Sequence, residues 1–464
     1  MLIRRAEVWQ RGISDVRIAD GLIADIGKLE VRPGEQVIEA NGGALLPGLH
    51  DHHIHLAASA VRAQSVICGP PEVTNADELA ARLAVPGDGW LRGILYHESV
   101  MGLPDARELD GLAPHRPIRV QHRSGRMWLL NSLALEQLLA NASPPPGLER
   151  VDGKYTGRLF DEDAWLQSAL ASQPPSLRDI SRELAQYGVT GVTDMSPRND
   201  ATFAAHIESE VSCGSLVQRC MVAGTLSLAN VPLTARYCIG PAKLHLHENA
   251  MPDFDETVAF IRAAHAQGRP LASHCTTETE LVFTLAALEA AGIMAGDRIE
   301  HAGITRDSHV SEIARMGLAV VSQPHFVAER GDQYLHDVEP ELHHALYRLG
   351  SFRDAGVVLA GGSDAPFGSL NPWAAMAAAV SRSTGNKTII GENEALTPEQ
   401  AVALYLADPA DLATQSKLEI GGPADLCLLS RSWHQARESL SSQNVAATIV
   451  AGRIVHQGIN QPPI

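Results

Sequence analysis

The chain has 464 residues and a formal net charge of −17 at pH 7. Hydrophobic residues make up 45% of it and charged residues 20%, which is a globular composition and excludes a disordered chain. Nucleic acids and anionic membranes would be repelled by such an acidic surface, so the charge disfavours both as partners.

The cysteines and the N-terminus bear on the cellular compartment. The six cysteines include no C-x-x-C pair and predict no disulfide framework. The first residues lack the apolar core of a secretory signal, and no run of about 18 uncharged apolar residues predicts a membrane span. We therefore expect a cytoplasmic protein. Its expected partner is a small-molecule substrate, and a homodimer is the candidate assembly.

The two ends of the chain share one pattern. Residues 1–46 and 418–464 contain short runs of alternating apolar residues that are broken by Gly and Asp. Such runs are typical of strands joined by tight turns. Because chain termini often lie close together, we expect both ends to form one small β-sandwich domain.

Residues 47–417 alternate short apolar strands with longer amphipathic segments, a pattern that indicates βα units and a parallel sheet. Helical spacing of apolar residues predicts helices at 255–267 and 281–291. Eight strands of this kind predict an α/β fold, a TIM-type (β/α)8 barrel. The predicted strands are Leu45–Leu56, Gly188–Met195, Val217–Gly224, Ala242–His247, Pro270–Cys275, Asp297–Ala302, Leu318–Gln323 and Val357–Asp364.

A long stretch at about 60–180 interrupts the alternation after the first strand and is predicted to be an insertion. It contains two strand-like runs, 90–96 and 117–121, and a predicted helix at 131–139. An insertion there lies on the face of a barrel where active sites form, so we expect it to supply substrate contacts, with a surface decoration as the alternative. The candidate contacts are His122, Arg123 and Arg126 for a polar or anionic group and Trp128 for packing, each of which also has a purely structural interpretation.

Histidines and an aspartate stand at the ends of several predicted strands. His53 and His55 are two residues apart at the end of the first strand, so their side chains point to one side and can hold one metal ion. His274, His301 and Asp364 end three other strands. Because the carboxyl ends of barrel strands converge, we expect all five to meet in one pocket. Four imidazoles and a carboxylate suit a divalent transition metal such as zinc.

Lys243 lies at the end of the fourth predicted strand, followed by His245 and His247. Its amine could form a salt bridge, anchor the substrate, or react with carbon dioxide to give a carbamate that bridges two cations. Either His245 or His247 is an alternative metal ligand at this strand. The residue pattern by itself leaves these interpretations open.

The segment 47–55, Pro-Gly-Leu-His-Asp-His-His-Ile-His, resembles the signature of the metal-dependent amidohydrolase superfamily. The order H-x-H, Lys, His, His, Asp is similar to that of its binuclear members over the whole chain. More narrowly, the chain resembles amidohydrolase family 3, the N-substituted formamide deformylase-like group. The segments that carry this likeness are Trp90–Gly93, Asn131–Leu135, Gly188–Asp194, Arg298–Ala302, Ser363–Pro366, Leu396–Ala401 and Gly422–Leu426.

The resemblance implies a barrel with a flanking β-domain and two divalent metal ions, with Zn²⁺ as the expected metal. The ligands that it implies are His53, His55 and Asp364 at the more buried ion, His274 and His301 at the second, and a carboxylated Lys243 that bridges the two. The chain departs from the family pattern at His247, after His274 and at 124–126. These places belong to the expected substrate pocket, where His247 is a further candidate substrate-binding residue.

These features predict a metal-dependent hydrolase that cleaves a non-peptide C–N bond in an amide, an N-formyl or N-acyl compound, or a cyclic amide. A metal-bound hydroxide is expected to attack the carbonyl carbon. Asp364 would accept the proton of the water and pass it to the leaving nitrogen. His325 is a second candidate catalytic residue, placed to donate to the oxyanion or to an acid group of the substrate, and an exposed loop histidine is its alternative.

Other functions remain in competition. A single-metal deaminase of this superfamily needs a glutamate at H-x-x-E spacing, and from His274 that position is Thr277, with Glu278 and Glu280 nearby. A carbamate or ester hydrolase would use the same metals. A non-catalytic binding barrel is the third alternative, and the complete set of candidate ligands disfavours it.

Overall fold

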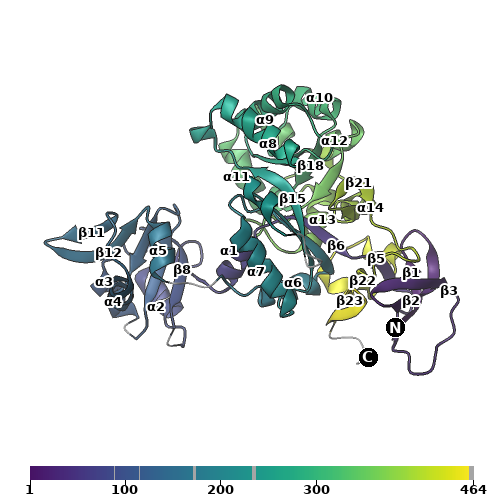
Figure 1. Ribbon diagram of the computed structural model, residues 1–464, viewed down its shortest axis with the longest axis horizontal. Coiled ribbons are helices and arrows are strands. Elements are labelled where there is room, and N and C mark those ends of the chain that lie inside the picture. The colour runs from purple at the N-terminus through teal and green to yellow at the C-terminus, as the bar shows by residue number, and fades with distance from the viewer. Residues whose placement is uncertain (88, 114, 171–173, 233–236, 459–464) are drawn as a thin grey trace. The chain divides into compact units, whose positions relative to one another are not determined.

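The computed structural model describes residues 1–87, 89–113, 115–170, 174–232 and 237–458. They form two compact units. The first unit combines Met1–Leu56 with Ser176–Ile464, and the second is Ala57–Pro175 (Figure 1). Among the helices of these ranges, none is both long and apolar enough to cross a membrane.

Eight parallel strands of the first unit form the predicted barrel. Each strand pairs with the next along the chain, as a right-handed succession of βα units requires. The strands are β6 (Leu49–Ile54), β13 (Val189–Asp194), β14 (Arg219–Gly224), β15 (Tyr237–Leu244), β16 (Leu271–Cys275), β17 (Arg298–His301), β18 (Ala319–Ser322) and β19 (Leu359–Gly361). The prediction of a TIM-type barrel is thereby confirmed.

The barrel closes where β6 meets the segment that follows β19. The amide of Asp364 donates to the carbonyl of His53 at 2.7 Å, and the amide of His55 donates to the carbonyl of Ala365 at 2.9 Å. Gly362 permits this close approach, because a Cβ at that position would lie 2.6 Å from the backbone nitrogen of His53. The seam thus places His53, His55 and Asp364 beside one another.

The first predicted strand, Leu45–Leu56, is two strands in the structure. The chain turns from β5 (Ala44–Pro47), in the terminal sheet, into β6 of the barrel. Gly48 stands between them, and a Cβ there would lie 2.0 Å from the hydroxyl of Thr190. The break therefore follows from close packing at Gly48, which a hydrophobic pattern does not reveal.

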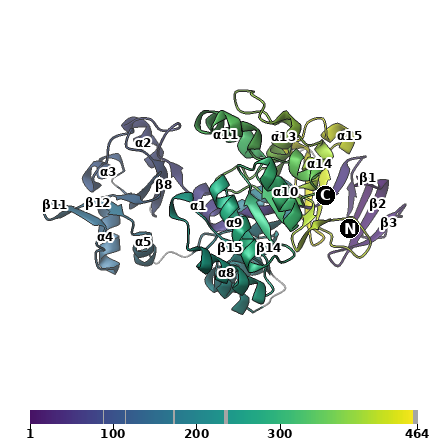
Figure 2. The ribbon, with the colours of Figure 1, turned by 90° about the horizontal axis from the view of Figure 1, so that it is seen from above.

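Helices cover the outside of the barrel and bury one apolar face each. α8 and α9 lie next to each other there, and both pack against β16 (Figure 2). Val258, Ile261, Leu281 and Leu285 are among their buried residues. The helices of this unit after β13 are α7 (Ala201–Ser212), α8 (Phe254–Ala266), α9 (Glu278–Ala291), α10 (Asp307–Met316), α11 (His325–Asp337), α12 (Gly350–Asp354), α13 (Pro372–Ser381), α14 (Pro398–Ala403) and α15 (Trp433–Ala436), and α6 (Arg178–Gln186) precedes it.

The two ends of the chain share one sheet, seen as purple and yellow strands in Figure 1. Its hydrogen-bonded order is β24-β23-β22-β5-β1-β2-β3, and β4 pairs with β1. The strands form one continuous path, so a second layer, and with it the sandwich, stays a prediction. The strands are β1 (Leu2–Val8), β2 (Gly12–Ala19), β3 (Leu22–Gly27), β4 (Val37–Glu39), β5, β22 (Leu426–Leu429), β23 (Val445–Val450) and β24 (Arg453–Gln457).

The second unit has a six-stranded sheet of its own with the order β11-β12-β10-β9-β8-β7. Strands at 91–96 and 118–122 and a helix at 132–141 occur where the sequence predicts two strands and a helix. Its elements are α1 (Leu56–Ala63), β7 (Val66–Ile67), α2 (Ala76–Leu83), β8 (Leu91–Tyr96), α3 (Ala106–Leu112), β9 (Ile118–His122), β10 (Met127–Leu130), α4 (Ser132–Asn141), β11 (Leu148–Val151), β12 (Lys154–Phe160) and α5 (Asp163–Ala169).

Candidate metal centre

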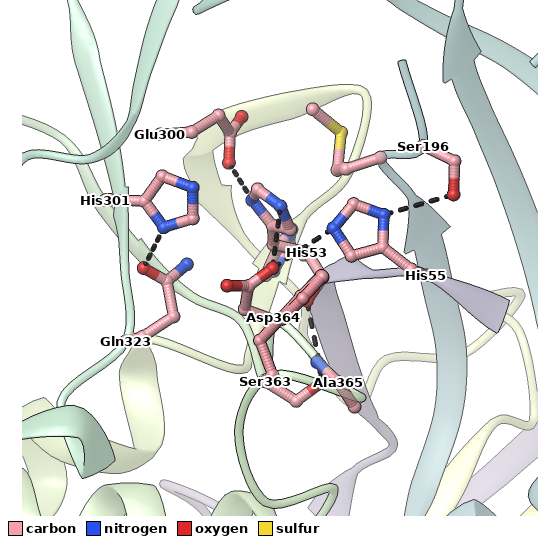
Figure 3. Close-up of polar contacts among 12 residues, drawn as sticks. His53, His55, Ser196, Glu300, His301, Gln323, Ser363, Asp364 and Ala365 are labelled. Atoms are coloured by element: carbon pink, nitrogen blue, oxygen red, sulfur yellow. Dashed lines mark hydrogen bonds and ion pairs between the residues drawn. The ribbon is translucent and has the colours of Figure 1, made fainter. Parts of the chain in front are cut away.

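Three predicted ligands converge at the carboxyl ends of the barrel strands (Figure 3). His53, His301 and Asp364 each offer one ligand atom, and these atoms lie within 4.8 Å of one another. Asp364 Oδ1 lies 3.4 Å from His53 Nε2 and 3.1 Å from His55 Nε2. His53 belongs to β6 and His301 to β17, and Asp364 follows β19. The ends of the barrel strands thus bring together residues that are more than 300 positions apart in the sequence.

The other candidate ligands line the same cavity, which has a volume of about 480 Å³. The ring of His274 lies 4.5 Å from that of His301 and stacks on that of His245 at 4.7 Å. His247 follows, with its ring 4.4 Å from His245. Lys243 also lines the cavity, and its Nζ is buried without a hydrogen-bond partner among the described residues. All predicted metal ligands therefore face one space.

The Nδ1 atom of each central imidazole is held by a neighbouring polar group. Glu300 accepts from His53 Nδ1 at 2.5 Å, and Gln323 Oε1 lies 2.8 Å from His301 Nδ1. Because a carboxylate and an amide oxygen only accept, both histidines carry their proton on Nδ1 and direct the Nε2 lone pair into the site. Neither Glu300 nor Gln323 was predicted from the sequence to have a role in the site. The sequence marks these two residues only by their position at strand ends: Glu300 precedes His301, and Gln323 follows β18.

Burial and local charge set the protonation of the site. Burial lowers the pKa of His53 and His301 below the ordinary 6.5 of imidazole, so both are neutral at neutral pH, the form that binds metals. Burial also lowers the pKa of Lys243 from its usual 10.5. Burial opposes ionisation of Asp364, but the His55 hydrogen bond and the nearby imidazoles keep its pKa below 3.8. An ionised carboxylate thus faces neutral nitrogen donors.

Two buried polar atoms test whether this donor set fits a metal ion. His301 Nε2 and Lys243 Nζ have no hydrogen-bond partner within the described part of the chain. Leaving a buried polar atom without a partner costs free energy, so native proteins rarely do so without a bound group. A divalent ion beside Asp364 would use the His301 lone pair and compensate the carboxylate. The residues therefore fit a divalent metal.

The backbone is strained at two of the candidate ligands. His301 has φ +72° and Asp364 has φ +50°, in the left-handed region that costs a non-glycine residue about 1–3 kcal/mol. At Asp364 the strain is held by the amide hydrogen bond to His53 that closes the barrel. Strain of this kind concentrates at functional sites because it fixes a side chain in place.

The structure does not bring His325 to the cavity. Its side chain is 1% exposed, its Nε2 donates to the carbonyl of Ser363 at 2.9 Å, and it is not among the described residues that line the cavity. Burial lowers its pKa to about 4, so the ring is neutral. The ring is therefore buried rather than exposed on a loop, and it anchors the residue before Asp364. Its role as a donor to the oxyanion or to the substrate stays a prediction.

The four insertion residues lie in the second unit, where each has a local environment. His122 Nε2 lies 2.8 Å from Glu98, and Arg126 pairs with Asp161 at 2.7 Å. Trp128 is 4% exposed, packs in the core of its unit and donates to Asp163, which leaves little of its ring for a substrate. Arg123 is exposed, and its amide donates to the carbonyl of Tyr96. Their contact with a substrate stays a prediction.

Another part of the cavity wall is apolar, and its residues were not predicted from the sequence. Phe326 and Tyr334 come from α11, and Leu346 and Tyr347 precede α12. Phe367 follows the Asp364 loop and places its ring 5.7 Å from that of His55, edge to face. No spacing in the sequence marks these residues, because they come from separate segments that meet only in the folded chain.

Comparisons with known proteins identify the family of the chain. The model of the amidohydrolase family matches residues 36–456. The chain is 26% identical to an N-substituted formamide deformylase of Arthrobacter pascens, over 90% of each chain, and 24% identical to the Bacillus subtilis (strain 168) amidohydrolase YtcJ, over 95% of this chain and 96% of that protein. It shares its fold with a metal-dependent hydrolase of Pyrococcus horikoshii (TM-score 0.75, 19% identity, 93% of this chain and 97% of that one). Since the family match spans most of the sequence, this chain belongs to the amidohydrolase family and is a hydrolase that acts on carbon–nitrogen bonds.

Proposed function

We propose that the chain hydrolyses a non-peptide C–N bond of a small N-formyl, N-acyl or cyclic amide. The observation that carries this proposal is the convergence of His53, His301 and Asp364 within 4.8 Å at the wall of a cavity of about 480 Å³. A cavity of that size suits a small molecule. The similarity to an N-substituted formamide deformylase favours N-formyl compounds among the candidates.

Two divalent ions, with zinc as the candidate, form the second part of the proposal. The ligands would be His53, His55, Asp364, His274 and His301, with a carboxylated Lys243 between the ions. Support comes from the buried Nζ of Lys243, which has no partner among the described residues, and from burial that lowers its pKa. An uncharged amine is the form that reacts with carbon dioxide, so this environment favours the modification.

The chemistry follows from the protonation of the site. A divalent ion, when bound, lowers the pKa of a coordinated water and polarises the carbonyl oxygen of the substrate. Asp364 is ionised, so it can accept a proton from the attacking water and deliver it to the leaving nitrogen. Glu300 keeps His53 in one tautomer while this happens. The net reaction adds one water across the C–N bond. An open-chain amide gives a carboxylic acid and an amine, and a cyclic amide gives one ring-opened molecule that carries both groups.

The two glutamates of the deaminase alternative have other partners. Glu280 accepts the amides of Thr276 and Thr277 at the start of α9, at 2.7 and 3.1 Å. Glu278 pairs with Arg306 at 2.7 Å. Neither carboxylate is among the described residues that line the cavity. The site therefore favours hydrolysis of an amide over a deaminase that needs such a glutamate.

The test of this function combines metal analysis with a substrate screen. The metal-replete protein is offered N-formyl, N-acyl and cyclic amides, and amine release is measured. Lys243→Ala should lose metal and activity, and a short carboxylic acid such as acetate should restore part of both. The exposed Lys417 supplies the control, because Lys417→Ala should keep wild-type metal content. Full metal content in Lys243→Ala would contradict the proposal that Lys243 bridges the two ions. Absence of turnover of every amide would contradict the proposed reaction.

A further inference from the structure

The cavity contains one cation that the proposed reaction does not use. Arg330 lies on α11 and lines the cavity, where Lys243 is the one other lysine or arginine among the described residues. Its guanidinium carbon lies 4.3 Å from the centre of the Phe326 ring. One of its nitrogens donates to the carbonyl of Phe367. These two contacts hold the guanidinium in place at the cavity wall.

Arg330 has no carboxylate partner within 4.0 Å among the described residues, although acidic side chains flank it in the sequence. Glu329 instead accepts the amide of Ser369 at 3.2 Å. Asp332 accepts from the hydroxyl of Thr384 at 2.7 Å. A guanidinium has five N–H donors, so Arg330 keeps both its charge and free donors for a ligand.

Apolar surface connects this cation with the metal ligands. The ring of Phe367 contacts His55 edge to face, and the carbonyl of the same residue accepts from Arg330. A single residue thus spans the path from a metal ligand to the guanidinium. Tyr347 adds a second aromatic surface, with its ring 5.7 Å from Phe326 and 5.8 Å from Tyr334. A molecule that reaches from the metal centre to Arg330 would lie along aromatic side chains.

We propose that the substrate is an N-formyl or N-acyl amine whose nitrogen substituent is an apolar, preferably aromatic, group that ends in a carboxylate, and that this carboxylate binds Arg330. This inference rests on the proposed function of the site. For an N-formyl substrate the reaction is R–NH–CHO plus H₂O giving R–NH₃⁺ and formate. The carboxylate takes no part in the chemistry and orients the substrate through a charge-assisted, forked hydrogen bond.

The test compares two probes of the same shape, the N-formyl derivatives of 4-(aminomethyl)benzoate and of 4-(aminomethyl)benzamide. The wild-type, metal-replete enzyme should prefer the benzoate by about 10- to 100-fold in kcat/KM, the usual contribution of a charged hydrogen-bond pair. Arg330→Gln keeps a donor for the Phe367 carbonyl but has no charge. This variant should bring the ratio of kcat/KM for the benzoate to that for the benzamide close to one, through a higher KM for the benzoate. Arg330→Lys should retain part of the preference.

A surface arginine provides the matched control. Arg315 lies on α10 with its side chain 60% exposed, and Arg315→Gln should leave the ratio at its wild-type value. Calorimetric titration of the two deformylated products, 4-(aminomethyl)benzoate and 4-(aminomethyl)benzamide, into each metal-replete protein gives the same comparison without turnover. Equal handling of both probes by the wild type, or an unchanged ratio in Arg330→Gln, would overturn the carboxylate site while amide hydrolysis stands. Absence of hydrolysis across all amide classes would instead remove the proposed function, and the titration would still decide whether Arg330 binds the carboxylate.

Discussion

At the residue scale, the candidate metal centre consists of candidate ligands that hydrogen bonds from neighbouring side chains hold in position. Glu300 orients His53, Gln323 orients His301, and Ser196 Oγ lies 3.1 Å from His55 Nδ1. Glu300 is itself held by Arg298, whose Nε donates to it at 2.6 Å inside the barrel. The lone pairs that would bind a metal are thus directed before any metal arrives. Affinity should depend on these orienting groups as well as on the ligands.

Glu300→Gln tests this dependence. The variant keeps the size of the side chain but removes the charge that fixes the His53 proton on Nδ1, so metal affinity should fall about 10- to 100-fold. Competition with a chelator of known affinity measures the change. The exposed Glu289 on α9 supplies the control, since Glu289→Gln should bind metal as the wild type does. Wild-type affinity in Glu300→Gln would contradict the orienting role.

Asp364→Asn tests the proton transfer. Asparagine keeps the shape and one oxygen but does not accept the proton of the water, so kcat should fall about 10²- to 10⁴-fold. Metal content must be measured beside the rate, because Asp364 is also a candidate ligand. Asp354→Asn, on the surface with its side chain 70% exposed, is the matched control and should be fully active. Normal turnover by metal-replete Asp364→Asn would contradict proton transfer by Asp364.

At the scale of elements, the terminal sheet has its own buried ion pair. Arg17 in β2 contacts Glu35 with two nitrogens, at 2.8 and 3.1 Å, and both side chains are less than 10% exposed. The same glutamate accepts the amide of Arg32, which ties the loop before β4 to the sheet. The hydrogen bonds from Arg17 lower the pKa of Glu35 from 4.5 to about 2.

This shift predicts how the stability of the terminal sheet depends on pH. The folded-state pKa of Glu35 lies below the unfolded value, so its contribution is complete above about pH 4.5 and is lost as the pH falls towards 2. Glu35→Gln should therefore melt at a lower temperature than the wild type at pH 7, and the difference should shrink between pH 5 and pH 3. Scanning calorimetry at several pH values measures it. A difference that stays constant with pH would show that Glu35 acts through packing alone.

At the scale of the whole molecule, every residue proposed to bind metal belongs to the first compact unit. Polar and charged groups are close together there, at the barrel seam, at the strained His301 and Asp364, and at the buried Lys243. A ligand that binds the folded chain alone stabilises it by mass action. Metal binding should therefore be coupled to the stability of the barrel as well as to activity.

Metal removal tests this coupling. Protein purified without chelator should contain more than one equivalent of divalent metal by elemental analysis. Exhaustive chelation should abolish activity and lower the melting temperature, and readdition of zinc should reverse both effects. Saturation at one equivalent would contradict the two-metal site, and an unchanged melting temperature after complete removal would contradict the coupling.

The sequence by itself determined the barrel, the joint β-structure of the two termini and the residues that meet at the candidate metal centre. These depend on patterns that neighbouring residues encode: alternating strands and helices, the H-x-H spacing, and polar residues at strand ends. The comparisons confirm the family and the hydrolytic class, while the coordination of metal by each residue stays a prediction.

Only the tertiary structure decided which groups surround those residues. The partner of His53 is 247 positions away at Glu300, and the apolar wall with Arg330 comes from segments that the barrel brings together. It also decided that the first strand breaks at Gly48 and that His325 is buried, since both depend on how closely distant segments pack. Strand periodicity is a property of short segments, whereas contacts across the barrel arise only when the chain closes on itself.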